Sequence, residues 1–364
     1  MLIKELVKII ETEAPLALQE SYDNAGLIIG NDANEISGVL ICIDVTEKIV
    51  DEAKAGNFNM IVSHHPLIFS GLKRITGQNE VQKCVTKAIK NDIAIFAAHT
   101  NLDSVAHGVS GKMAEKIGLQ NTQILIPVSN SLMKIVTYVP RLHIFSVREA
   151  LFAAGAGEIG NYDSCSFTSE GTGTFRAKEN AKPFVGSIDK FHNEPELRLE
   201  LIFPAYLKHK IIEALLVSHP YEEPAYDIIS LENQWNKVGM GIIGELVEPE
   251  DELDFLKRIK SVFNAGAVRY TQLLNKKICK VAVCGGSGSG LLKAAMAKQA
   301  DVYISGDFKY HEFFDAENKI LIADIGHFES EQFTKDVFFE IITKKMPTFA
   351  VRISEINTNP INYL

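Results

Sequence analysis

Six short apolar runs, each ending in a polar or glycine-rich turn, most constrain how this chain can fold. They are rich in β-branched residues and lead into segments with helical periodicity, an alternation that is typical of an α/β sheet. Three lie before residue 128 and three after residue 278: GVLICID, NMIVSHH, IAIFAAHT, KVAVCGG, DVYISGD and ILIADIGH. The sheet-forming material therefore comes from both ends of the sequence, which predicts a two-lobed α/β core interrupted in the middle.

The middle of the chain predicts a compact unit of its own. Its apolar pattern indicates the order β-α-β-β-α-β, which is that of a ferredoxin-like domain. Turn-rich sequence flanks it, IPVSN before and ENQWNKVGMG after, as expected where a domain is inserted into a surface loop of another. We therefore expect residues 1–128 and 238–364 to form a discontinuous core, and residues 129–237 to form an inserted domain.

The composition limits the partners and the compartment. A net charge of -9 repels a phosphate backbone, so we do not expect a nucleic-acid partner. The five cysteines form no C-x-x-C pair, which indicates a reducing compartment. Residues 1–15 have the spacing of an amphipathic helix, and no apolar run approaches the roughly 18 residues that a membrane span needs. We expect a cytoplasmic protein without a membrane partner.

The first pair of candidate ligands is His64 and His65, in the segment SHHP directly after an apolar run. Ligands of α/β sheets bind outside the carboxyl ends of strands, and these residues lie at such an end. Adjacent side chains on a continuing strand would point to opposite faces. The strand end and Pro66 remove that restriction, so both imidazoles can face one centre. A surface loop with two incidental histidines is the alternative.

The second candidate segment is HTNLD, which follows the run IAIFAA and carries His99 and Asp103. If a helical turn begins there, these two side chains, four positions apart, can face one site. Asp103 can equally cap a helix that begins near Ser104, and this segment alone favours the cap.

The third segment, HFESE, follows the run ILIADIG near the end of the chain. If residues 328–339 are helical, His327 and Glu331 lie one turn apart on the same helix face and form a chelating pair. A solvated first helical turn is the competing interpretation, because acidic side chains favour the positive end of a helix. That interpretation explains Glu331 but gives His327 no role.

Three segments far apart in the sequence thus bring imidazoles and carboxylates to the edge of a predicted α/β sheet. The candidate ligands are His64, His65, Asp103, His327 and Glu331. This mixed set suits Zn, Mn, Fe, Co or Ni better than calcium, which prefers oxygen throughout. A single catalytic zinc ion usually takes three protein ligands, so five fit two divalent ions that share a carboxylate. We expect two ions per subunit, with zinc first and Mn, Fe, Co or Ni as alternatives.

A glycine-rich segment, CGGSGSG at residues 284–290, follows a predicted strand and opens a helical run. It has leucines where a Walker loop requires Lys and Ser or Thr, and its glycines do not fit the dinucleotide pattern. Either an anion lies on its amides or the segment is a tight, crowded turn. Asp307 and His311, at another strand end, are expected to support the site or the fold rather than bind metal.

Together these motifs resemble the GTP cyclohydrolase I type 2 homologue family, also called the NGG-interacting-factor-three-like proteins. The resemblance extends over essentially the whole chain through YDNAGLIIG, VSHHPLIF, AAHTNLD, CGGSGSG, SGDFKYHE and IGHFESE. Residues 129–237 resemble the PII-like domain of the longer bacterial members, through segments such as SHPYEEPAYDI. The resemblance implies a two-metal site with the same five ligands, and a toroidal homohexamer whose sites face an internal cavity.

Two functional hypotheses follow. The first is a metal-dependent hydrolase that acts on a C=N, amide or phosphoryl centre of a nucleotide-like small molecule, with His99 as the candidate catalytic residue for proton transfer or support of the site. The second is a non-catalytic metal-binding regulatory protein whose PII-like insertion senses a small ligand. Turnover of a nucleotide panel by metal-loaded protein separates the two hypotheses.

Overall fold

A computed structural model describes residues 1–364, and the chain forms two compact units. One combines Met1–Ile126 with Lys237–Leu364, and the other is Pro127–Asn236. Within them lie a five-stranded, a six-stranded and a four-stranded sheet. The structure thus confirms a mixed α/β fold built from several sheets. No helix combines the length and the apolar composition that are needed to cross a bilayer.

The five-stranded sheet places the first candidate ligands. Its order is β1-β4-β3-β2-β15, with bounds β1 Gly26–Ile29, β2 Val39–Cys42, β3 Met60–Ser63, β4 Ala94–Ala97 and β15 Val351–Ile353. β15, β2, β3 and β4 are parallel, whereas β1 is antiparallel to β4. The carboxyl ends of β2, β3 and β4 therefore meet at one edge of this sheet.

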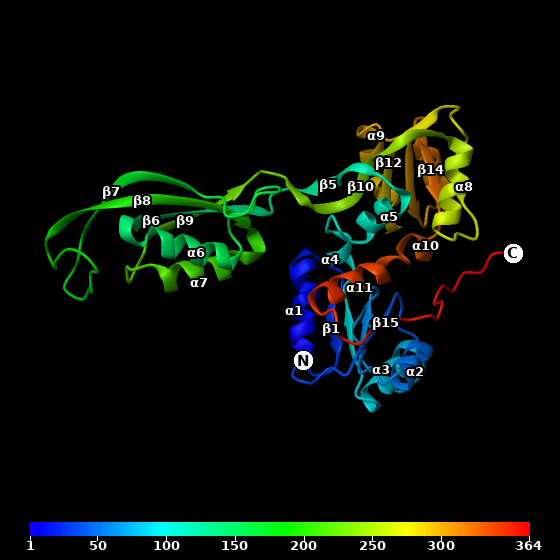
Figure 1. The fold of residues 1–364 in the computed structure, drawn as a ribbon, viewed down its shortest axis with the longest axis horizontal. Coiled ribbons are helices and arrows are strands. Elements are labelled where there is room, and N and C mark those ends of the chain that lie inside the picture. Colours follow the sequence, from blue (N-terminus) through cyan, green and yellow to red (C-terminus); the bar gives the residue numbers. More distant parts are fainter. The chain divides into compact units, whose positions relative to one another are not determined.

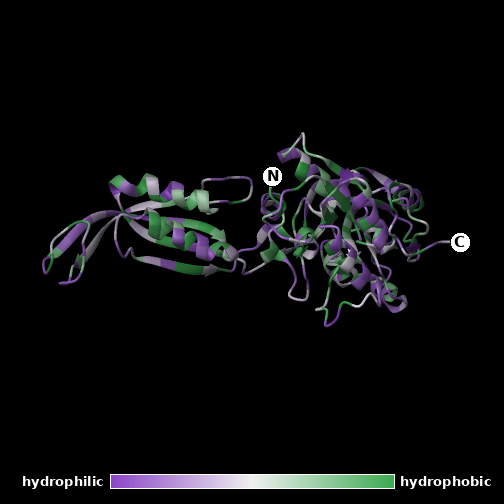
Figure 2. Cartoon of the chain, turned by 90° about the horizontal axis from the view of Figure 1, so that it is seen from below, coloured by the Kyte–Doolittle hydropathy of each residue, from purple (hydrophilic) through white to green (hydrophobic).

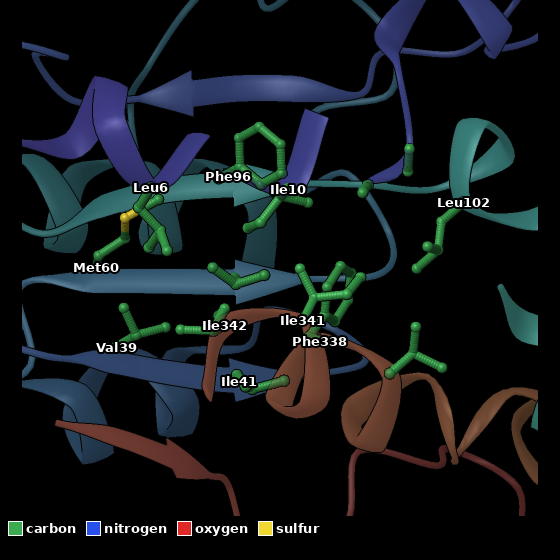
Figure 3. Packing of buried hydrophobic residues seen from close by; sticks show 14 of the residues in the cluster. Leu6, Ile10, Val39, Ile41, Met60, Phe96, Leu102, Phe338, Ile341 and Ile342 are labelled. Carbon is green, nitrogen blue, oxygen red and sulfur yellow. The ribbon is translucent and has the colours of Figure 1, made fainter. Parts of the chain in front are cut away.

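Both faces of this sheet are covered by helices, which explains why its strands are almost wholly apolar. The helices are α1 Ile3–Glu13, α2 Glu47–Ala55, α3 Glu80–Lys90 and α11 Thr334–Lys345. Successive strand residues face opposite sides. Met60 lies beside Leu6 of α1 (Figure 3), in the core that also contains Phe338 of α11, whereas Ile61 belongs to the core beneath α2 and α3. Figure 1 shows α1 and the pair α2 and α3 on opposite sides of the sheet.

The six-stranded sheet has the order β11-β14-β13-β12-β10-β5. Its bounds are β5 Gln120–Val128, β10 Trp235–Asp251, β11 Arg269–Tyr270, β12 Lys277–Ser287, β13 Val302–Gly306 and β14 Leu321–Asp324. β12, β13 and β14 are parallel. Residues of α5 Val109–Ile117 and α8 Glu252–Val262 pack in one core, and residues of α9 Leu292–Ala297 in a second. The carboxyl end of β14 leads directly into the last candidate segment.

The predicted single helix over residues 328–339 is instead two helices, α10 His327–Glu331 and α11. The side-chain amide of Gln332 donates to the carbonyl of Phe263 at 2.6 Å, and Phe333 packs on the Phe263 ring at a centroid distance of 5.7 Å. α10 is thereby held against the six-stranded sheet, whereas α11 packs into the core of the five-stranded sheet. Because of this break, consecutive helices of one segment pack against two different sheets.

The unit Pro127–Asn236 has the element order β-α-β-β-α-β. Its elements are β6 Leu132–Pro140, α6 Ile144–Ala154, β7 Phe167–Arg176, β8 Phe191–Pro204, α7 Lys208–Ser218 and β9 Tyr226–Leu231. The sheet order is β7-β8-β6-β9, and every pair is antiparallel. Side chains such as Val147 and Leu215 of the two helices bury one sheet face in a separate core. In Figure 2 these helices carry both hydrophobic and hydrophilic residues along their length.

Candidate metal centre

The candidate ligands follow three strand ends within the first unit. His64 and His65 come directly after β3, Asp103 ends the short helix α4 Thr100–Asp103 after β4, and α10 carries the last two after β14. The His64 and His65 rings lie 4.9 Å apart, and the His65 and His327 rings 5.5 Å apart. The structure therefore brings the predicted residues into one cluster, although they come from two different sheets.

The turn after β3 explains why two adjacent histidines face one centre. The backbone N–H groups of His64 and His65 donate to the carbonyls of Cys42 and Ile43 at 3.3 and 3.0 Å. The Ser63 hydroxyl donates to the His65 carbonyl at 2.9 Å. These bonds hold the chain where it leaves the strand, so the alternation of side chains along a strand no longer separates the two imidazoles.

Glu331 lies at the centre of the cluster. Its Oε1 atom is 3.6 Å from His64 Nε2, and its Oε2 atom is 3.1 Å from His65 Nε2 and 3.2 Å from His327 Nε2. Asp103 Oδ1 lies 3.8 Å from His64 Nε2. The two oxygens of this carboxylate thus face different imidazoles, Oε1 that of His64 and Oε2 those of His65 and His327.

Each histidine of the cluster has an acceptor beside its Nδ1 atom. The pairs are His64 with the Ala98 carbonyl (3.0 Å), His65 with Asp44 (2.7 Å), His99 with Asp23 (2.9 Å) and His327 with Asp307 (2.6 Å). Such an acceptor keeps a proton on Nδ1 and fixes the ring orientation, which leaves Nε2 to bind a metal ion. Four imidazole rings held in this way argue against the alternative that His64 and His65 are incidental histidines of a surface loop.

His99 lies against the same cluster. Its ring is 5.2 Å from that of His64 and 5.3 Å from that of His65, in edge-to-face arrangements. Ligand atoms of His64, His65 and His99 all lie within 4.8 Å of one another, as do those of His65, His327 and Glu331. His99 is therefore placed within reach of a group bound at the centre.

The glycine-rich segment lies beside Glu331. Gly286 has a φ of +62°, and a Cβ added there would lie 2.2 Å from Glu331 Oε1. The Gly286 N–H donates to the Ser330 hydroxyl at 2.9 Å. Of the two interpretations of this segment, the structure favours the crowded turn, because any side chain at this position would displace the central carboxylate.

Mutual charge stabilises the central groups. Burial opposes the charge of Glu331, but the imidazoles around it, His64 above all, hold the pKa of this carboxyl well below its usual range. Burial also opposes protonation of His65, yet the carboxylates of Asp44 and Glu331 raise its pKa to about 10. The adjacent Glu331 carboxylate, against burial, raises the pKa of His327 to about 9. Without metal, protons on these imidazoles supply the positive charge that Glu331 needs.

The pKa values of Asp103 and His99 are shifted in the directions that favour the neutral side chains. Burial raises the pKa of the Asp103 carboxyl to about 7, although His64 counteracts part of the shift. Burial and the charge of His64 lower the pKa of His99, so that this imidazole is neutral near pH 7 and free to accept a proton.

Three buried polar atoms of the cluster have no hydrogen-bond partner: His64 Nε2, Asp103 Oδ1 and Glu331 Oε2. Buried polar atoms are normally paired, because an unpaired one costs roughly 1 to 3 kcal/mol. These three belong to ligand types that bind divalent cations and point at one place. The cluster therefore fits a metal ion chemically.

Several supporting residues were not identified from the sequence. Asp44 follows β2 at the same sheet edge, so the strand-end rule that selected His64 applied to it as well. Asp23, which holds His99, lies in a loop and gave no such signal. Asp307 contacts His327 as a supporting residue was expected to, whereas His311 is exposed and packs on Tyr310.

The fold and these side chains define a mixed α/β protein with a cluster of histidines and carboxylates where parallel strands end. The profile of the Duf34/NIF3 (NGG1p interacting factor 3) family matches residues 1–360. The chain belongs to this family, as the sequence motifs predicted.

Relatives of similar length support the assignment. A Halalkalibacterium halodurans protein named "GTP cyclohydrolase 1 type 2 homolog" is 38% identical over 364 residues, covering 99% of this chain and 98% of the relative. The Bacillus subtilis protein of the same name is 37% identical over 371 residues, with the same coverage. The crystal structure of a Bacillus cereus protein related to NIF3 is 39% identical, with a TM-score of 0.87 and coverage of 100% of this chain and 99% of the other.

Proposed function

We propose that this chain binds two divalent metal ions through His64, His65, Asp103, His327 and Glu331. One ion would be held by His65, His327 and Glu331, and the second by His64, Asp103 and the other oxygen of Glu331. The observation that carries the proposal is the cluster of buried atoms without a hydrogen-bond partner, His64 Nε2, Asp103 Oδ1 and Glu331 Oε2. The Nδ1 atoms of His64, His65 and His327 each lie beside an acceptor. Resemblance to the family implies the same five ligands.

The donor set favours zinc, with Mn, Fe, Co or Ni as alternatives, because it combines imidazole nitrogens with carboxylate oxygens. Cys284 lies near the cluster on β12, and a thiolate there would change the preferred metal. Burial raises the pKa of this thiol to about 12, so it is protonated in the metal-free protein.

The proposed reaction is hydrolysis of a nucleotide-like small molecule. Two divalent ions supply the chemistry by lowering the pKa of water and polarising a carbonyl, imine or phosphoryl electrophile. The chain's own contribution is orientation and proton transfer. Neutral His99, held by Asp23 and close to His64 and His65, is in position to accept a proton from water or to give one to a leaving group.

Turnover tests this proposal. Metal-stripped protein is reloaded with zinc, manganese or iron(II) and incubated with GTP, other nucleotides and cyclic analogues, and products are separated by chromatography. GTP comes first because relatives carry a name that refers to GTP cyclohydrolase. We expect metal-dependent turnover that His99→Gln lowers at least tenfold while both ions are retained. Loss of metal in His99→Gln would make this residue a ligand instead.

A second candidate is a non-catalytic metal-binding regulator whose PII-like insertion senses a small ligand. It is favoured by the separate core of residues 127–236, their ferredoxin-like order of elements and a cavity of about 670 Å³ inside this unit. If no nucleotide is turned over by metal-loaded protein, this candidate replaces the hydrolase. In either case we propose a cytoplasmic homohexamer, which rests on the family resemblance.

A further inference from the structure

The cavity of about 670 Å³ lies entirely within residues 127–236. Small-molecule sites usually measure roughly 300 to 1,000 Å³. Its walls come from β7, β8, the loop after β7 and the segment after α7, and the residues that matter most are Phe175, Phe184, Tyr221, Glu196, Glu222 and Glu223. This cavity is independent of the candidate metal ligands, none of which lines it.

Three aromatic rings form one wall of the cavity. The Tyr221 ring lies 6.4 Å from that of Phe175 and 6.2 Å from that of Phe184, both tilted. Phe184 is 51% exposed, although the loop that carries it is tied down by the Lys182 N–H, which donates to Glu222 at 2.8 Å. A fixed loop that presents a large apolar side chain to solvent beside a cavity suits a flat ligand body.

Tyr221 is held from both ends before any ligand binds. Its backbone N–H donates to His219 Nδ1 at 3.1 Å, and the other nitrogen of that ring lies 3.0 Å from the carbonyl oxygen of Tyr138. Its hydroxyl donates to Glu196 Oε1 at 2.7 Å. A side chain that is already ordered loses little conformational entropy when a ligand packs on it.

Negative charge exceeds positive charge in the lining of the cavity. Four carboxylates line it, Glu170, Glu196, Glu222 and Glu223, of which Glu170 is paired with Arg141. Arg198 is its single basic residue, and the guanidinium already lies 3.1 Å from Glu200. A phosphate group would meet repulsion here and find no free cation, whereas an ammonium or amidinium group would be attracted.

The absence of a side chain at Gly173 leaves room for the Glu196 carboxylate. A Cβ on Gly173 would lie 2.2 Å from Glu196 Oε2, so only glycine leaves this oxygen undisturbed. Oε1 is occupied by the Tyr221 hydroxyl, whereas Oε2 accepts no hydrogen bond from the protein. Both Gly173 and Glu196 line the cavity. Oε2 is thus an acceptor available to a donor group of a ligand.

We infer that this cavity binds a small organic cation with a flat, apolar body. Glu196 receives the ammonium or amidinium N–H groups, and the rings of Phe184 and Tyr221 pack against the body and attract the charge. This goes beyond the metal centre and assigns the inserted unit a ligand class that excludes nucleotide phosphates.

Tyramine is the probe, and 4-hydroxyphenylacetate is its matched control, because it has the same ring with a carboxylate in place of the ammonium group. Binding to the full-length protein is measured by calorimetry and ligand-observed NMR. We expect tyramine to bind at least tenfold more tightly than 4-hydroxyphenylacetate. Glu196→Gln should weaken tyramine roughly tenfold, since it keeps an acceptor for Tyr221 but removes the charge. Phe184→Ala should weaken it roughly threefold to tenfold.

Glu149→Gln is the control variant, because it removes the same charge from an exposed residue of α6 that does not line the cavity. It should bind tyramine like the wild type, and so should metal-stripped protein, which separates this inference from the metal centre. Equal binding of the two probes, tyramine binding that survives Glu196→Gln combined with Phe184→Ala, or tighter binding of ATP at the same residues would each overturn the inference.

Discussion

Asp44 offers the sharpest test of how the imidazoles are held. Its Oδ1 atom lies 2.7 Å from His65 Nδ1, and its Oδ2 atom accepts a bond from the Thr358 hydroxyl at 2.8 Å. In the wild type, Asp44 orients the His65 ring and raises its basicity. Asp44→Ala removes this acceptor. The candidate ligand then loses its fixed direction while Nε2 itself remains, so weaker metal binding would be a positioning effect.

The magnitude follows from the environment. Loss of a group that orients a metal ligand typically lowers affinity roughly tenfold to a hundredfold, or about 1.4 to 2.8 kcal/mol. The Asp44 side chain is 35% exposed, so water can partly replace it, and we expect the lower end, roughly tenfold. Thr358→Val removes only one hydrogen bond to Asp44 and should weaken metal binding about threefold to fivefold.

The assay is competition between metal-stripped protein and a chromophoric chelator for zinc or cobalt(II). Asp51→Ala is the control, because Asp51 is an exposed carboxylate that pairs with Lys87 on a neighbouring helix, away from the site. The thermal midpoint of each metal-free variant shows whether it is folded. Asp44→Ala protein that is folded and binds both ions within twofold of the wild type would refute the reasoning.

Four further predictions concern pH, the inserted unit and assembly. The pKa values of His65 and His327 are raised to about 10 and about 9, so both imidazoles are protonated in the metal-free protein at pH 7 to 8. Zinc must displace these protons, so zinc affinity should rise as the pH increases toward 9 to 10. Calorimetry in two buffers measures the proton release. The same raised pKa values stabilise the metal-free fold fully below pH 6.5, and this contribution should be lost as pH rises through 9 and 10, so a midpoint that does not fall there contradicts the assignment. Replacement of residues 127–236 by a short linker should leave a folded core that binds metal, because β5 and β10 are neighbours in one sheet and all five candidate ligands lie outside this span. Aggregation with every linker length tried would show that the insertion is integral to the fold. Sedimentation should give six times the chain mass of 40.3 kDa, and a monomer or dimer at working concentrations would rule out the hexamer.

The strand-end residues could be found from the sequence because their signal is local. His64 and His65 end an apolar run, and His327 and Glu331 have helical spacing, so each segment carried its own evidence. The sequence predicted that these segments meet at the edge of one α/β sheet, whereas they come from two sheets; spacing along the chain says nothing about how two sheets pack. In the structure, the contact between these segments is made by the Glu331 carboxylate, which lies against His64 and His65.

The supporting groups could not be predicted in the same way. Asp23 reaches His99 across 76 positions of sequence, and a backbone carbonyl, that of Ala98, holds His64. Loop conformation decides such contacts, and neither composition nor periodicity describes it. The break between α10 and α11 could not be predicted either, because no glycine or proline marks it; Phe333, at the break, packs on Phe263 from a distant part of the chain.

Metal content is the measurement that tests the central claim most directly. Full-length protein, stripped with chelator and reloaded, is analysed by elemental mass spectrometry and by anomalous diffraction beside wild-type and Glu331→Gln samples. We predict two ions per subunit in the wild type, with Glu331 between them, and the loss of at least one ion in Glu331→Gln. A single ion bound only through His64 and His65, or two ions at wild-type affinity in Glu331→Gln, would contradict the account.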